Sequence, residues 1–192
     1  MYLHAEQRYA PSSVKYQAIR DALSTEHRLE LKDEEMGYET YVSGWSIGHM
    51  VPDHAYQILV HLTGMIPSPG SPHFTVSADG EDLIARACCA YWRKANAVHR
   101  WFVENCQDGV DECQLSDPIH LEVLAGLMHS CKQVIENPEL AEELLPTESG
   151  FFFGGTEYDE YYLEDLKQTI QQIDHVVKTY PKPLVLRYRS SW

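Results

Sequence analysis

The chain has 192 residues, of which 44% are hydrophobic and 11% aromatic, so it can bury a core and is not a disordered chain. Its 15 basic and 29 acidic side chains give a formal charge of −14, which argues against a general binder of nucleic acid or anionic membranes. No apolar run reaches the roughly 20 residues of a membrane-spanning helix, and the first residues do not resemble a secretory signal. We therefore expect a cytoplasmic protein that contacts neither membrane nor nucleic acid directly.

The sequence contains five cysteines without a recognisable redox or zinc motif. Their number is odd, two of them are adjacent, and no C-x-x-C pair is present. This pattern argues against a disulfide framework and against a zinc ribbon, and it favours a reduced compartment. Because Cys106, Cys113 and Cys131 have no regular ligand spacing with His129, we expect buried thiols, and we expect neither a metal nor a cofactor.

The first half of the sequence predicts short strands that alternate with helices. Apolar residues recur at helical spacing over 14–31, whereas residues 38–42 alternate in the manner of a strand. The dipeptide Asp79-Gly80 between two apolar runs is typical of a β-hairpin turn. A proline-rich loop at 67–72 could be a hinge, so residues 11–66 are a possible separate sub-lobe. The predicted elements are strands at 1–9, 38–42, 74–76 and 83–91, and helices at 14–31 and 53–62.

The second half predicts mostly helices. Asp117-Pro118 and Asn137-Pro138 are typical helix starts, and apolar residues at helical spacing follow both. The predicted elements are helices at 92–106, 117–136, 137–145 and 156–180, followed by a flexible or strand-like tail at 181–192. We therefore expect an α+β fold: a helix-dominated single domain over residues 1–192 with a small antiparallel sheet.

The charges are segregated along the chain. Residues 83–103 contain Arg86, Arg93, Lys94 and Arg100 but no acid, whereas residues 133–166 contain ten acids and no lysine or arginine. Arg93 and Lys94 fall in the first turn of the helix predicted at 92–106, where the helix dipole already presents positive potential. Two cations beside free backbone N–H groups would suit an anion such as a phosphate. The alternative is that these cations pair with carboxylates of the acidic segment.

Other side chains on the same helix would complete a nucleotide pocket. Trp92 offers a stacking plane, Asn96 an amide that can read a base edge, and His99 a donor or acceptor. On the last helix, Tyr158 and Tyr162 share a face and could line a pocket wall. The structural alternative for Trp92 is a place in the core, and for His99 an internally bonded histidine. The predicted ligand-binding residues are Trp92, Arg93, Lys94, Asn96, His99, Tyr158 and Tyr162.

Motifs for catalysis are absent from the sequence. The glycine-rich segment 149–156 lacks the lysine of a Walker A loop and runs into carboxylates, so we interpret it as structural. The sequence has no G-x-S-x-G, no H-E-x-x-H and no deaminase zinc motif. An acid–base pair of His99 with Glu157 or Asp159 is the remaining enzymatic option. We predict no catalytic residues.

Three segments resemble a family of uncharacterised accessory proteins of tailed bacteriophages and prophages. They are MYLHAEQRY, YWRKANAVHRWFVENCQDGVDEC and LLPTESGFFFGGTEYDEYYLEDLKQTIQQI, and the likeness covers residues 84–177 best. Some members carry the label phosphoglycerate kinase, but this chain is too short for that two-domain enzyme and lacks its glycine pattern. The resemblance implies a phage accessory protein in the host cytoplasm, and such proteins often counter host defence.

The residues and the resemblance together lead to one functional prediction with two alternatives. The prediction is a non-catalytic binder that sequesters a phosphorylated, nucleotide-like small molecule, a role that a homo-oligomer with shared pockets would suit. The first alternative is an inhibitor whose acidic surface at 136–165 docks a host defence protein. The second alternative is an enzyme that degrades a nucleotide phosphoester.

Overall fold

The computed structural model of the chain describes residues 1–27, 40–43, 54–111, 113, 115–150, 154–180, 182–183 and 185–191. The chain divides into two compact units, each built from several segments. Unit 1 consists of Met1–His4, Ala90–Thr179 and Val185–Trp192, and unit 2 of Ala5–Cys89 and Tyr180–Leu184. None of the helices in the described ranges has the length and apolar character that crossing a membrane requires.

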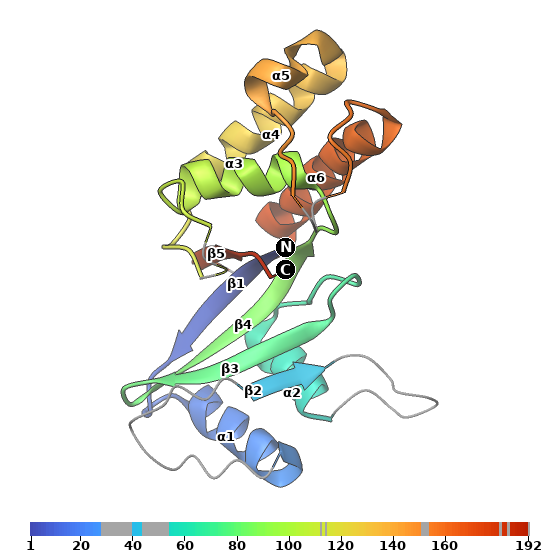
Figure 1. Cartoon of the computed structure of the whole chain (residues 1–192). Coiled ribbons are helices and arrows are strands. Elements are labelled where there is room, and N and C mark those ends of the chain that lie inside the picture. Colours follow the sequence, from blue (N-terminus) through green and yellow to red (C-terminus); the bar gives the residue numbers. More distant parts are fainter. Residues whose placement is uncertain are drawn as a thin grey trace. The chain divides into compact units, whose positions relative to one another are not determined.

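The strands form one sheet, with the order β2-β3-β4-β1-β5 among the described residues. Within unit 2, β2 pairs with β3 and β3 pairs with β4, and both pairings are antiparallel. Helices dominate the rest of the chain, so the predicted α+β class with a small antiparallel sheet is confirmed (Figure 1). The strands are β1 (Tyr2–Tyr9), β2 (Thr40–Ser43), β3 (His73–Asp79), β4 (Asp82–Tyr91) and β5 (Val185–Arg189).

Unit 2 contains α1 (Val14–His27), α2 (His54–Thr63) and the hairpin of β3 and β4. In this hairpin Asp79 faces Asp82 across a two-residue turn. Gly80 occupies the turn with φ +60°, a left-handed conformation that glycine adopts without steric cost. The hairpin predicted from Asp79-Gly80 is therefore confirmed. The end of the predicted helix at 28–31, the start of the predicted strand at 38–39 and the first residue of the predicted helix at 53–62 lie outside the described residues.

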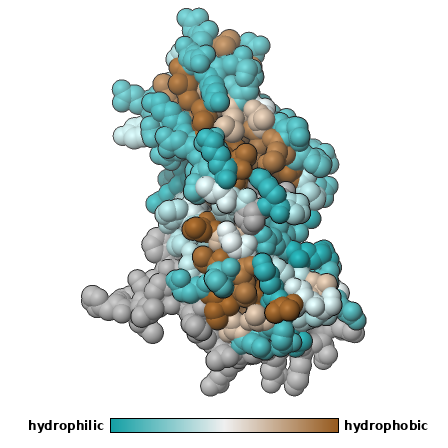
Figure 2. Space-filling view, turned by 180° about the vertical axis from the view of Figure 1, so that it is seen from behind, coloured by the Kyte–Doolittle hydropathy of each residue, from teal (hydrophilic) through white to brown (hydrophobic). Residues whose placement is uncertain are grey.

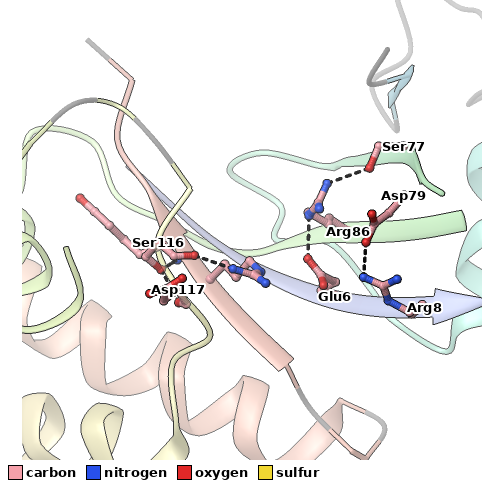
Figure 3. Close-up of polar contacts among 9 residues, drawn as sticks. Glu6, Arg8, Ser77, Asp79, Arg86, Ser116 and Asp117 are labelled. Atoms are coloured by element: carbon pink, nitrogen blue, oxygen red, sulfur yellow. Dashed lines mark hydrogen bonds and ion pairs between the residues drawn. The ribbon is translucent and has the colours of Figure 1, made fainter. Parts of the chain in front are cut away.

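Side-chain ion pairs cross the strands of unit 2 (Figure 3). The Arg86 Nε–H donates to Glu6 at 2.8 Å, and its Nη1 donates to the Ser77 hydroxyl at 3.1 Å. Both charged side chains are largely buried, at 14% and 9% exposure. Arg8 pairs with Asp79 and Asp82 at the surface. Arg86, one of the basic residues in the acid-free segment, thus has its partner within the fold.

Unit 1 contains α3 (Asn96–Cys106), α4 (Leu121–Glu136), the 3-10 turn η1 (Pro138–Leu140), α5 (Ala141–Leu144) and α6 (Glu160–Thr179). Helices α4 and α6 pack against each other through an apolar core. Leu124 and Leu127 of α4 and Leu166 and Ile173 of α6 are fully buried. Seen from behind, the helical part at the top of the view carries apolar patches between hydrophilic side chains (Figure 2).

Three predicted helices of unit 1 begin later than expected. The helix predicted from residue 92 begins at Asn96, the one predicted from 117 begins at Leu121, and the last one begins at Glu160 instead of 156. Asp159 explains the last start, because its Oδ1 accepts the backbone N–H groups of Tyr161 and Tyr162 at 3.0 Å each. The predicted short helix at 137–145 is confirmed as η1 and α5, and the tail contains strand β5.

Candidate functional site

Arg93 and Lys94 lie in the four-residue link between β4 and α3, so placing them inside the first helical turn was wrong. The link is a bend, and Lys94 has φ +65°, in the left-handed region that non-glycine residues rarely adopt. Ala95 occupies the N-cap position of α3 without a side-chain cap. Both cationic side chains are exposed, and neither forms an ion pair with any residue that the structure describes. They therefore stand directly ahead of the positive end of α3.

The start of α3 also presents backbone donors. The Asn96 N–H donates to the Lys94 carbonyl at 2.9 Å and the His99 N–H to the Ala95 carbonyl at 3.0 Å. The N–H groups of Ala97 and Val98 have no acceptor in the described part of the chain. Free N–H groups at a helix N-terminus attract negative charge.

A cavity of about 360 Å³ adjoins this helix end and lies entirely within unit 1. We call it the α3–α6 cavity, because its walls come from the start of α3, the Gly154-Gly155 segment and the first half of α6. Gly154 has φ +83°, and a Cβ there would lie 3.3 Å from the Cβ and the carbonyl oxygen of Lys94. Glycine avoids both the close contact with Lys94 and the strain that a side chain would have at this φ. Of the predicted ligand-binding residues, Arg93, Lys94, Asn96 and Tyr162 line the cavity.

Asn96 holds the cavity wall together. Its side chain is 4% exposed, its Nδ2 donates to the Gly155 carbonyl at 2.6 Å, and its Oδ1 accepts the Glu148 N–H at 3.3 Å. The amide thus fastens the segment around Gly155 to the start of α3. Because both ends of the amide already have protein partners, Asn96 is a positioning residue and does not read a base edge as predicted.

Trp92 and His99 do not line the cavity, contrary to their predicted roles. Trp92 is 3% exposed and its indole N–H donates to the Thr169 hydroxyl at 2.9 Å, so the structure places it in the core. His99 is 1% exposed, with Nδ1 2.7 Å from the Tyr188 hydroxyl and Nε2 2.9 Å from Asp111. These contacts occupy both ring nitrogens, so His99 belongs to a buried polar network.

Of the two tyrosines predicted to share a face of the pocket, only Tyr162 lines the cavity. Tyr158 is 41% exposed and stacks edge-on against Tyr162, but it does not line the cavity. Tyr162 lines the cavity, yet its ring is 7% exposed and its hydroxyl donates to the Leu145 carbonyl at 2.9 Å. Burial raises the pKa of Tyr162 well above its usual range. The aromatic side chain open to the cavity is Tyr161, at 82% exposure, which sequence reasoning missed.

Four carboxylates also line the cavity and outnumber its two cations. Asp159 is engaged as the N-cap of α6, and Glu164 contacts Lys167 at 4.0 Å. Asp165 is half-buried, and its carboxylate has no partner among the described side chains. Burial, with the nearby charges of Glu164 and Asp159, raises the pKa of Asp165 to about 6. The cavity therefore combines a cationic helix end with a wall of hydrogen-bond acceptors.

The described residues show neither a cluster of metal-ligating side chains nor a low-pKa thiol. Within the described ranges, no cluster of three or more histidine, cysteine, aspartate or glutamate side chains could hold a metal ion. Cys131 is buried, as predicted, whereas Cys106 and Cys113 are only half-buried, which the prediction of buried thiols did not foresee. Cys88 and Cys89 are buried as well. Burial raises the pKa of both Cys88 and Cys131 to about 12, so these thiols are protonated near neutral pH.

Comparisons with protein-family models, curated proteins and solved structures find no match to this chain. The resemblance to phage accessory proteins therefore stays a prediction, and function has to be inferred from the α3–α6 cavity itself.

Proposed function

We propose that the protein binds a phosphorylated, nucleotide-like small molecule in the α3–α6 cavity and releases it unchanged. The observation that carries the proposal is the position of Arg93 and Lys94, which stand without a carboxylate partner in the described chain beside a cavity and ahead of a helix N-terminus. Two cations at the positive end of a helix raise the free energy of the fold by about 0.3–1 kcal/mol each, unless an anion neutralises them.

Backbone features of the link support an anion at this end of the cavity. The free N–H groups of Ala97 and Val98 give the phosphate two further donors. The left-handed conformation of Lys94 costs about 1–2 kcal/mol relative to an ordinary conformation. Backbone strain of this kind clusters at ligand-binding sites, where it holds a side chain in place.

The opposite wall argues against inorganic phosphate as the ligand. Arg93 and Lys94 contribute two positive charges, whereas the four lining carboxylates contribute up to four negative ones. A small mono- or dianion would be repelled by the excess, but a longer molecule can place its phosphate at α3 and hydrogen-bond donors at α6. A nucleobase supplies such donors, and a volume of about 360 Å³ lies in the ordinary range of small-molecule sites.

The same cavity favours binding over catalysis. No histidine, serine or cysteine is among its lining residues in the described chain, and His99 is committed to Tyr188 and Asp111. A histidine general base or a serine or cysteine nucleophile is therefore not at hand among the described residues of the cavity, and the lining carboxylates are the groups there that could transfer a proton. In a phage accessory protein, as the resemblance implies, binding without turnover would sequester a nucleotide signal of the host.

Equilibrium dialysis against labelled nucleoside monophosphates at low salt tests the proposal. We expect Arg93→Met and Lys94→Met each to weaken binding about tenfold, since a charge-assisted hydrogen bond contributes about 1.5–3 kcal/mol. Arg100→Met is the matched control, because Arg100 lies on α3 outside the cavity and pairs with Glu104 at 2.7 Å. Mass spectrometry of the released ligand should recover it intact. Equal binding by all three variants, or a hydrolysed ligand, would contradict the proposal.

A second candidate function rests on the acidic surface of η1 and α5. Glu136, Glu139, Glu142 and Glu143 are all exposed and form no ion pair with a described residue. Such a cluster would suit a basic host protein, and this binding would weaken steeply with salt. A complex with a host protein that survives half-molar salt, or that tolerates charge reversal at Glu142 and Glu143, would exclude this function.

A further inference from the structure

We propose that the α3–α6 cavity selects nucleotides whose base carries an exocyclic amine, with Tyr161 as the stacking platform for the base and Asp165 as the acceptor of the amine. This inference rests on the proposed function and adds the class of base. Tyr161 and Asp165 both belong to α6, whereas Arg93 and Lys94 lie ahead of α3.

Tyr161 has the properties of a stacking platform. Its side chain is 82% exposed although it lines a cavity, and it makes no ring contact with a described aromatic residue. An exposed aromatic ring with a free face is what nucleobases stack on, and the loss of one such ring weakens binding by about tenfold. Tyr162 lacks a free ring because Tyr158 packs against it with centroids 5.1 Å apart.

Asp165 lies one helical turn after Tyr161, on the same side of α6, and both residues line the cavity. Its carboxylate is half-buried and has no hydrogen-bond donor from the described side chains. A partly desolvated acceptor without a donor gains most from a ligand N–H group. The raised pKa, about 6, agrees with this environment and still leaves Asp165 ionised at pH 7.5.

The Asp165 carboxylate can distinguish bases by the group that they present to it. Cytosine presents an amine at the position where uracil presents a carbonyl, and adenine differs from hypoxanthine in the same way. A carboxylate accepts from the amine, whereas it meets the carbonyl as a second acceptor and is repelled. Discrimination by one such contact amounts to about tenfold in affinity.

Two ligand pairs that exchange the exocyclic amine for a carbonyl, and with it add a hydrogen to the neighbouring ring nitrogen, provide the test. At pH 7.5 we expect the unmodified protein to bind CMP about tenfold more tightly than UMP, and AMP about tenfold more tightly than IMP. In Asp165→Asn, which keeps the side-chain shape, both preferences should fall below about twofold. Tyr161→Leu should weaken CMP and UMP equally, by about tenfold, whereas Tyr161→Phe and the control Tyr158→Leu should not.

The outcomes separate this inference from the proposed function. If CMP and UMP bind equally tightly, or if Asp165→Asn keeps the full preference, the base-class inference is wrong while binding in the cavity stands. If no nucleotide binds and the Arg93→Met protein behaves like the unmodified one, the proposed function and the inference both fail. Circular dichroism melting of each variant confirms that any loss of binding occurs in folded protein.

Discussion

Replacing Asn96 with alanine tests how the wall of the α3–α6 cavity is held. The change removes one hydrogen bond of 2.6 Å to the Gly155 carbonyl and one of 3.3 Å from the Glu148 N–H. Each side-chain hydrogen bond contributes about 1 kcal/mol net, and the freed backbone groups lie in exposed residues where water can reach them. We therefore expect the free energy of unfolding to fall by about 2 kcal/mol. In a chain of this size that corresponds to a melting temperature lower by about 4–8 °C.

Thermal unfolding followed by circular dichroism measures this change, and Asn105→Ala is the matched control. Asn105 lies on the same helix and donates to the Trp101 carbonyl at 2.8 Å, but its side chain is exposed. The control should stay within about 0.5 kcal/mol of the unmodified protein. If Asn96→Ala melts together with Asn105→Ala, the amide does not fasten the segment at Gly155, and the cavity wall is held by other contacts.

Three further predictions concern the same structure. Gly154→Ala should destabilise the protein by about 1–2 kcal/mol in urea unfolding, because φ is +83° and the new Cβ meets Lys94. The control Gly155→Ala should change stability by less than about 0.5 kcal/mol, because the space around its Cβ is open. Arg86→Met should cost about 3–5 kcal/mol, because it removes the charge that pairs with the buried Glu6 carboxylate. Glu104→Ala, which breaks an exposed pair, should cost about 0.5 kcal/mol or less. Asp165 should make stability depend on pH, because its folded pKa of about 6 lies above the usual carboxyl value of 3.8. Its stabilising contribution is complete below pH 3.8 and is lost as pH rises through 6, and Asp165→Asn should flatten the stability curve in that window. If the two glycine variants lose the same stability, or if the two ion-pair variants do, the reasoning for that pair is wrong. If the stability of Asp165→Asn depends on pH as that of the unmodified protein does, the reasoning for Asp165 is wrong.

Features that depend on neighbouring residues could be predicted from the sequence. The hairpin at Asp79-Gly80 follows from turn chemistry that acts over four residues, and the short helical segment after Asn137-Pro138 follows from a local start signal. The start of α3 could not be predicted in this way. Trp92 exchanges backbone hydrogen bonds with Met1, at 3.0 and 3.1 Å, and this pairing holds Trp92 in an extended conformation although its apolar spacing continues the helix. A contact across 91 positions leaves no local pattern.

The candidate site could be predicted only in part, because some of its contacts join segments that lie far apart in the sequence. Arg93 and Lys94 were found because their charges stand out in an acidic chain, and both line the cavity. Both partners of Asn96, by contrast, lie more than fifty positions away, and Tyr188, one of the two partners of His99, lies 89 positions away. Tyr161 was missed because the helix was expected to start at 156, and the spacing alone gave Tyr158 and Tyr162 the pocket face. The later start at Glu160 leaves Tyr158 outside the helix, and Tyr161 and Asp165 line the cavity together with Tyr162.

The most direct measurement of the central claim is a ¹H–¹⁵N correlation spectrum of the labelled protein during titration with CMP. We predict that the amides of Ala97, Val98 and Gly155 shift first and together, since they line the α3–α6 cavity beside the cationic link. Amides of the groove lined by α4 and α6, such as those of Ala125 and Met128, should stay in place. Shifts confined to that groove, or a spectrum that does not change at millimolar CMP, would contradict a phosphate site at the start of α3.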